Sequence, residues 1–117
     1  HRDLLLKTAR QQARAMAGAG YRLAAEPNIK LTGRAGRGVL DVTLYIMTEA
    51  KWASPYDKVL AGKVAHIMTG GDLSEPQEVS ESYILKLERE AILECFRDDR
   101  THKRMEHMLK TGKPLRN

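Results

Sequence analysis

Three glutamates, Glu88, Glu90 and Glu94, come nearest in this sequence to a pattern that could do acid–base chemistry. Neighbouring carboxylates can act as a general acid and a general base when their surroundings move their pKa values apart. These three, however, lie on the charged side of a stretch with helical periodicity, together with Lys86 and Arg89. Carboxylates on a solvated helix face normally serve as surface charge. The sequence therefore predicts no catalytic residue here.

Metal and nucleophile chemistry are also not supported by spacing. No pairing of Cys95 with His1, His66, His102 or His107 has the spacing of a structural zinc site. Cys95 falls on an apolar stripe, where a thiol behaves as a small hydrophobe. Because the cysteine is single and no signal peptide is visible, we expect a reducing, cytoplasmic setting. No run reaches the roughly 18 apolar residues that a membrane span needs.

Residues 33–38, Gly-Arg-Ala-Gly-Arg-Gly, could cradle a phosphate, because glycines let backbone N–H groups approach an anion. The spacing matches neither the dinucleotide-binding fingerprint nor the P-loop. The pattern favours a flexible connector in front of a helix.

The net charge of +5 is unevenly distributed. Residues 1–40 carry a net charge of +6, residues 41–96 carry −5, and residues 97–117 carry +4. Basic ends could bind phosphates, and a basic helical nucleic-acid-binding module is the alternative that this composition suggests. Against that alternative, the bases are split between the two ends and no helix has a clear recognition face. Solvated helix faces explain the charge more simply.

Apolar periodicity and capping residues predict an all-α bundle of about five helices, in a single domain over residues 1–117. The first helix covers 3–19, with Asp3 as N-cap, Leu4 to Leu6 in the core and Gly20 after its end. A short extended piece is expected at 29–31. Further helices are expected at 39–50, from Pro55 to about Thr69 with Ser54 as N-cap, at 84–96 after Ser80, and from a cap at Asp99 or Thr101 to the residue before Gly112.

Three finer expectations follow from the same patterns. The 39–50 helix is apolar on more than one side, which predicts that it is central and most buried, with Trp52 as a lid on the core. Residues 72–79 should form a polar loop. Asp99 or Thr101 should cap the last helix, and Gly112 should adopt the left-handed conformation after it.

The last third of the chain resembles the C-terminal end of the crotonase (enoyl-CoA hydratase) superfamily. The matching elements are Leu87-Glu88-Arg89-Glu90, Arg104-Met105-Glu106 and Lys113-Pro114. The stretches TGGD (69–72), LEREA (87–91) and HMLKTGKPLRN (107–117) are similar to the end of bacterial fusions of 3-hydroxyacyl-CoA dehydrogenase with a crotonase-type hydratase. The chain, which begins at His1 without methionine, is accordingly expected to be a C-terminal fragment of a larger multidomain enzyme of fatty-acid β-oxidation.

This resemblance implies a non-catalytic role for the chain itself. In such fusions the catalytic glutamates, the oxyanion hole and the NAD site lie upstream, so NAD and acyl-CoA are expected to bind the parent enzyme and no cofactor this fragment. Its partner would be the remainder of its own chain, whose crotonase half it would complete by packing or by subunit contact in a homo-oligomer. The lysine-rich tail of crotonases lies near the CoA nucleotide, which makes Lys110 and Lys113 candidates for contact with a CoA phosphate.

Overall fold

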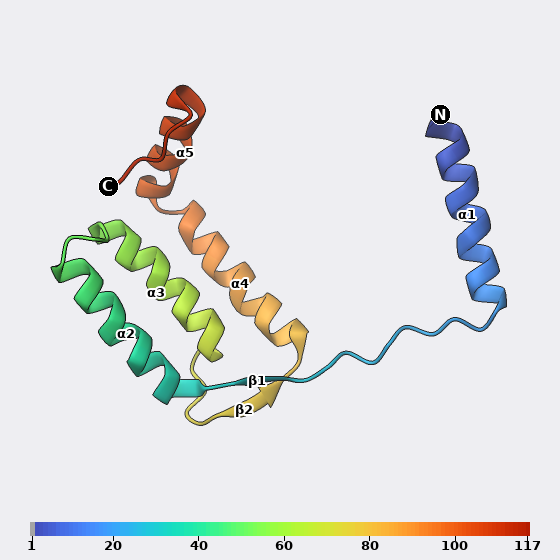
Figure 1. Ribbon diagram of the computed structural model, residues 1–117, viewed down its shortest axis with the longest axis horizontal. Coiled ribbons are helices and arrows are strands. Elements are labelled where there is room, and N and C mark those ends of the chain that lie inside the picture. The colour runs from blue at the N-terminus through green and yellow to red at the C-terminus, as the bar shows by residue number, and fades with distance from the viewer. Residues whose placement is uncertain (1) are drawn as a thin grey trace.

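A computed structural model describes residues 2–117, and within them it shows five helices and one small antiparallel sheet (Figure 1). The predicted all-α class with about five helices is confirmed. In chain order the elements are α1 (Arg2–Gly18), β1 (Ile29–Leu31), α2 (Gly33–Glu49), α3 (Pro55–Thr69), β2 (Gln77–Val79), α4 (Glu81–Phe96) and α5 (Asp99–Thr111).

Helix α1 stands apart from the other helices, at the end of the extended segment 19–28 (Figure 1). Every residue from 2 to 28 is exposed, so the prediction that Leu4 to Leu6 enter a core is wrong within this chain. The radius of gyration of the Cα atoms is 20.6 Å, whereas a compact domain of this size has a value of about 13 Å. Within residues 2–117, no other element therefore covers the alanine-rich helix α1.

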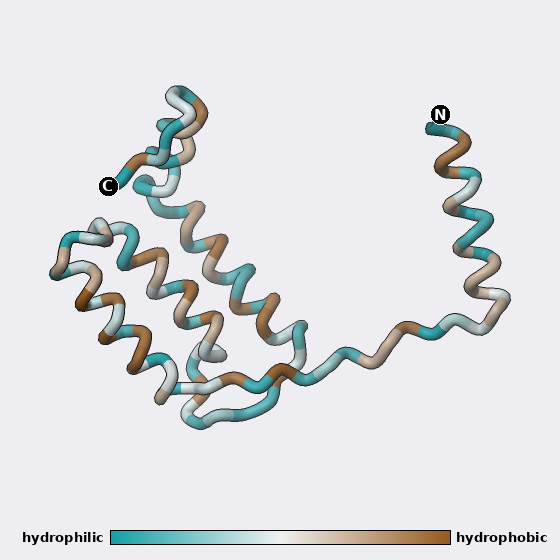
Figure 2. Tube along the Cα trace, viewed as in Figure 1, coloured by the Kyte–Doolittle hydropathy of each residue, from teal (hydrophilic) through white to brown (hydrophobic). Residues whose placement is uncertain are grey.

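Helix α3, and not α2, is the central helix. It packs against α2 on one side and α4 on the other, and it carries the buried residues Tyr56, Ala65 and Thr69. Figure 2 shows hydrophobic residues along α2, but only one side of that helix meets α3, and its only buried residue is Gly33. The prediction that α2 is the most buried helix is therefore wrong. Trp52 is 71% exposed and is not a lid on the core.

The two strands pair in antiparallel register, with Ile29 opposite Val79 and Leu31 opposite Gln77. The extended piece at 29–31 is confirmed, but the prediction of a loop throughout 72–79 missed β2. The sequence Gln77–Val79 has no apolar alternation, so its extended form depends on the hydrogen bonds to β1.

The start of α2 is also set by a distant contact. The helix begins at Gly33 and not at Val39, so the predicted connector at 33–38 is wrong. The Arg34 N–H donates a hydrogen bond of 2.9 Å to the carbonyl of Leu73, and the loop that contains Leu73 and Glu75 lies against Gly33. This loop provides an acceptor for an N–H group that the first turn of a helix leaves without a partner.

Local capping residues fix most other helix ends, as predicted. Ser54 and Asp57 form a reciprocal capping box at α3, with Pro55 in the first helical position, and Ser80 caps α4. The predicted glycines after helices α1, α3 and α5 all have positive φ: Gly20, Gly70 and Gly112. Two caps differ from the predictions, because Asp3 lies inside α1 and Asp98 caps α5 in place of Asp99 or Thr101.

Candidate interaction surface and polar junction

Apolar side chains without a covering layer are the largest feature of this surface. The chain exposes 9526 Å², about one and a half times the roughly 6,400 Å² expected for a compact monomer of its mass. The exposed side chains include Leu4, Leu5 and Met16 of α1, and Leu85, Ile92 and Phe96 of α4. Large apolar side chains that gather exposed on helix faces normally mark contact with another protein surface.

One exposed stripe is well defined by its helical spacing. Val39, Val42 and Ile46 follow one another at steps of three and four residues along α2 and are 68%, 60% and 55% exposed. We call these three residues the outer face of α2, because Leu40 and Leu44 on the other side are half-buried toward α3. Helix α2 is thus apolar on two sides, although α3 covers only one of them.

A groove of about 740 Å³ lies along α3 between α2 and α4. Its apolar lining comes from all three helices: Leu44, Val59, Gly62, Leu87 and Ala91. Charged side chains line it as well, and Arg37 pairs with Asp41 at 2.8 Å while Lys63 pairs with Glu94. An apolar lining between ion pairs suits contact with another protein segment.

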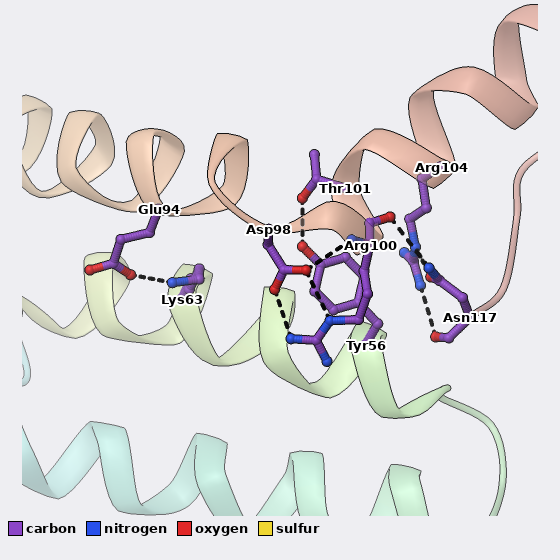
Figure 3. Close-up of polar contacts among 8 residues, drawn as sticks. All are labelled: Tyr56, Lys63, Glu94, Asp98, Arg100, Thr101, Arg104 and Asn117. Carbon is purple, nitrogen blue, oxygen red and sulfur yellow. Dashed lines mark hydrogen bonds and ion pairs between the residues drawn. The ribbon is translucent and has the colours of Figure 1, made fainter.

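At the other end of α3, Tyr56 is the centre of a polar junction with α5 (Figure 3). Its side chain is 1% exposed, and its hydroxyl lies 2.5 Å from the hydroxyl of Thr101. The guanidinium groups of Arg100 and Arg104 lie 4.3 and 4.9 Å from the ring centroid. Contacts of a cation with an aromatic ring contribute about 0.5–2 kcal/mol, more when they are shielded from water.

Arg104 joins α5 to the N-terminus of α3. Its Nη1 lies 2.8 Å from Asp57 Oδ1, and its Nη2 donates to the Ser54 hydroxyl at 3.2 Å. The pKa of Asp57 is lowered to about 2, first by the hydrogen bond from the Ser54 backbone N–H, then by the Ser54 side chain, with a smaller contribution from Arg104. Asp98, which binds Arg100, also has a pKa of about 2. Both carboxylates are therefore held in their charged form.

These two pKa values predict acid sensitivity of the junction. An aspartate with a lowered pKa in the folded state stabilises that state above its ordinary pKa of 3.8, and this contribution is lost as the pH falls toward 2. We therefore expect the free energy of unfolding to fall between about pH 4 and about pH 2. Urea denaturation followed by circular dichroism at several pH values measures this slope.

The variant Asp57→Asn is the control for that experiment. It should show a shallower dependence on pH, because it removes one of the two carboxylates of the junction whose pKa is lowered, while Asp98 keeps the other. A slope identical to that of the unmodified chain would contradict the assignment to Asp57.

The two lysines proposed from the tail lie at and beyond the end of α5. Lys110 is exposed and pairs with Glu106 one turn earlier. Lys113 is exposed too, and its backbone N–H donates to the Thr111 hydroxyl at 3.1 Å. The side chains are open to solvent, and the ion pair partly neutralises Lys110. Contact of either lysine with a CoA phosphate stays a prediction.

The glutamates considered for acid–base chemistry, Glu88, Glu90 and Glu94, all lie on α4 and are exposed. Glu90 lies 4.0 Å from Lys86, and the hydrogen bond from Lys63 lowers the pKa of Glu94. A lowered pKa suits an ion-paired surface carboxylate and not a general acid. In residues 2–117, no three histidine, cysteine, aspartate or glutamate side chains gather as a metal site would require.

None of the helices in this described range is long and apolar enough to cross a membrane.

No family model matches the sequence, and no solved structure matches it. Over all 117 residues, the chain is 35% identical to a Bacillus subtilis (strain 168) protein named "Probable 3-hydroxyacyl-CoA dehydrogenase". The chain is similar to one segment of that dehydrogenase. The match covers 15% of the length of the Bacillus subtilis protein. The match supports the relation to 3-hydroxyacyl-CoA dehydrogenases that we expected from the sequence of the last third of the chain.

The polar junction was not predicted from the sequence. One part of the junction does have a sequence pattern, because Ser54-Pro55 followed by Asp57 is typical of a capping box. The involvement of Arg104 and Asn117, which lie 50 and 63 positions after Ser54, has no local signature.

Proposed function

We propose that this chain is a non-catalytic helical part of a 3-hydroxyacyl-CoA dehydrogenase that also carries a crotonase-type enoyl-CoA hydratase. In this role it completes the crotonase half by packing or by subunit contact. The observation that carries the proposal is the uncovered apolar surface on α1, on the outer face of α2 and on α4. Such a surface is costly in water and is stabilised when a further layer of protein covers it.

The similarity to the Bacillus subtilis dehydrogenase supports the enzyme class of the parent protein. NAD and the acyl-CoA substrate would bind to other parts of that parent. The hydratase half rests on the resemblance of residues 87–90, 104–106 and 113–114 to the crotonase superfamily. Lys113, and to a smaller extent the ion-paired Lys110, would supply positive charge for a CoA phosphate.

A chimera tests this proposal. The matching segment of the Bacillus subtilis dehydrogenase is replaced by this chain, and two activities are measured separately: hydration of a 2-enoyl-CoA, and NADH formation from a 3-hydroxyacyl-CoA. We expect the chimera to retain both. With Ile46→Glu in the outer face of α2, hydration should fall at least about tenfold, because burial of an unpaired charge costs several kcal/mol. NADH formation should stay within about twofold, since the proposed contact is with the crotonase half.

Two controls make the result specific. Ser82→Glu adds the same charge at an exposed polar position of α4 and should leave both activities unchanged. The 117-residue chain with Ile46→Glu should unfold at the same urea concentration as the unmodified chain, because Ile46 is 55% exposed in it. Loss of NADH formation alone would place the contact on the dehydrogenase half. A parent without any hydratase activity would overturn the crotonase part of the proposal.

The nucleic-acid-binding alternative predicts a different behaviour of the isolated chain. Basic groups that contact DNA phosphates give an affinity that falls steeply as salt rises. Titration of the chain with a fluorescent DNA duplex at low and moderate salt detects this dependence. Tight, salt-sensitive binding, together with an inactive chimera, would favour the alternative over the enzyme proposal.

A further inference from the structure

The last five residues of the described chain, 113–117, return to the N-terminus of α3. Gly112 adopts a left-handed conformation after α5, with φ of +68°, which turns the chain back. Leu115 is half-buried, and Asn117 lies beside the Arg104 side chain (Figure 3). We call residues 113–117 the strap.

Asn117 is held through three of its polar atoms. Its Oδ1 accepts a hydrogen bond of 2.6 Å from Arg104 Nε, and its Nδ2 donates to the carbonyl of Arg100 at 3.3 Å. Its backbone carbonyl accepts from Arg104 Nη2 at 3.4 Å and from the Tyr56 N–H at 3.3 Å. A donor and an acceptor of one carboxamide are thus both used, which is a pattern that only asparagine offers at this length.

The hydrogen bond from the Tyr56 N–H to the Asn117 carbonyl satisfies a backbone donor in the first turn of α3. The first N–H groups of a helix have no partner inside the helix. Ser54 accepts from Asp57, and the Asn117 carbonyl accepts from Tyr56, so side chain and strap cap different N–H groups of the same first turn. Arg116 adds a hydrogen bond from its guanidinium to the Trp52 carbonyl in the turn before α3.

Helix α5 depends on this region for its attachment. None of its residues is buried, and only residues 97–98 connect it to α4. Its contacts with α3 are made by Arg100, Thr101 and Arg104, and two of these three residues also bind Asn117. Release of the strap would therefore loosen the hold of α3 on α5.

We propose that the strap binds a specific socket, formed by the Tyr56 N–H, the Arg100 carbonyl and the Arg104 guanidinium, and that Asn117 is the residue this socket recognises. The bound strap fixes α5 on the unit of α2, α3 and α4. The ligand of the socket is an extended peptide segment that presents an asparagine carboxamide and its backbone carbonyl. In this chain that segment is its own strap, which also places Lys113 at a defined position.

Amide hydrogen exchange of the full chain, measured by NMR, tests the proposal at the Tyr56 N–H. An amide in the first turn of a helix is otherwise open to exchange, so its protection reports the Asn117 carbonyl directly. In Asn117→Ala, which removes the carboxamide, we expect protection at Tyr56 to fall at least about tenfold, because the side-chain hydrogen bonds to Arg104 and Arg100 that hold Asn117 in place are lost. Asn117→Asp keeps the acceptor but loses the Nδ2 donor, and should show a smaller loss.

Lys113→Ala is the matched control, because it changes an exposed strap residue whose side chain does not contact the socket. It should keep the protection of the unmodified chain. The fluorescence anisotropy of Trp52, the single tryptophan, gives a second readout, since Arg116 binds its carbonyl. It should fall in Asn117→Ala and stay unchanged in Lys113→Ala.

Three outcomes would overturn the proposal. Unchanged protection at Tyr56 in Asn117→Ala would show that the socket does not recognise the side chain. Loss of helix content by circular dichroism in both Asn117 variants would show that the strap is inseparable from the fold. Protection that grows with protein concentration would show that the strap of a second copy occupies the socket.

Discussion

Replacing Gly33 with alanine should lower the free energy of unfolding by about 3 kcal/mol. Gly33 has φ of +62°, a conformation that costs about 1–2 kcal/mol for a residue with a Cβ atom. That Cβ atom would also lie 2.7 Å from the Glu75 carbonyl oxygen and 2.9 Å from that of Leu73. Both are backbone atoms, so the loop must shift, which puts at risk the hydrogen bond between Arg34 and Leu73, worth about 1 kcal/mol.

Urea denaturation followed by circular dichroism measures this loss. The control is Gly38→Ala in the same helix, where an added Cβ atom meets nothing within 4 Å. That variant should gain about 0.5–1 kcal/mol, because alanine loses less backbone entropy than glycine in a helix. Equal effects of the two substitutions would contradict the role of the loop at Gly33.

Replacing Tyr56 with alanine is expected to have the second large effect, a loss of about 3–5 kcal/mol. Tyr56 is the only side chain of the described residues that is both large and fully buried. The substitution removes its packing, the hydrogen bond with Thr101 and the ring on which Arg100 and Arg104 lie. We therefore expect α5 to detach from α3 at lower urea than the rest of the chain unfolds.

Tyr56→Phe separates packing from hydrogen bonding. Phenylalanine keeps the ring and the contacts with the two arginines but leaves the Thr101 hydroxyl without its partner. Its cost should be about 1–2 kcal/mol, and α5 should stay attached. If Tyr56→Phe were as destabilising as Tyr56→Ala, the hydroxyl and not the ring would hold the junction. Hydrogen exchange along α5 distinguishes the two cases.

Both predictions concern contacts between segments that are distant in the sequence, and the acid sensitivity of Asp57 concerns the same junction as Tyr56. The proposed role in a larger enzyme concerns different surfaces, the apolar helix faces that no segment within residues 2–117 covers. If the proposal is right, substitutions at Gly33 and Tyr56 change the stability of the isolated chain, whereas Ile46→Glu changes only the activity of the parent. This separation is the practical test of which contacts are internal and which are external.

The sequence by itself determined the helical class, most helix ends and the character of each helix face. Ser54, Ser80, Gly70 and Gly112 act on backbone groups within about one turn, so their effect is readable from neighbours in the chain. The resemblance of residues 87–91 and 107–117 gave the relation to 3-hydroxyacyl-CoA dehydrogenases that the Bacillus subtilis protein supports.

Only the tertiary structure determined which elements pair with or pack against one another. β2 exists because β1 lies beside it, and α2 begins at Gly33 because the loop with Leu73 caps its first turn. Apolar periodicity shows that a helix has a face to bury but not which neighbour buries it, so it could not show that α3 is central or that α1 is uncovered. The junction of Tyr56 with Arg104 and Asn117 joins three distant segments, and only the folded chain brings their hydrogen-bonding groups together.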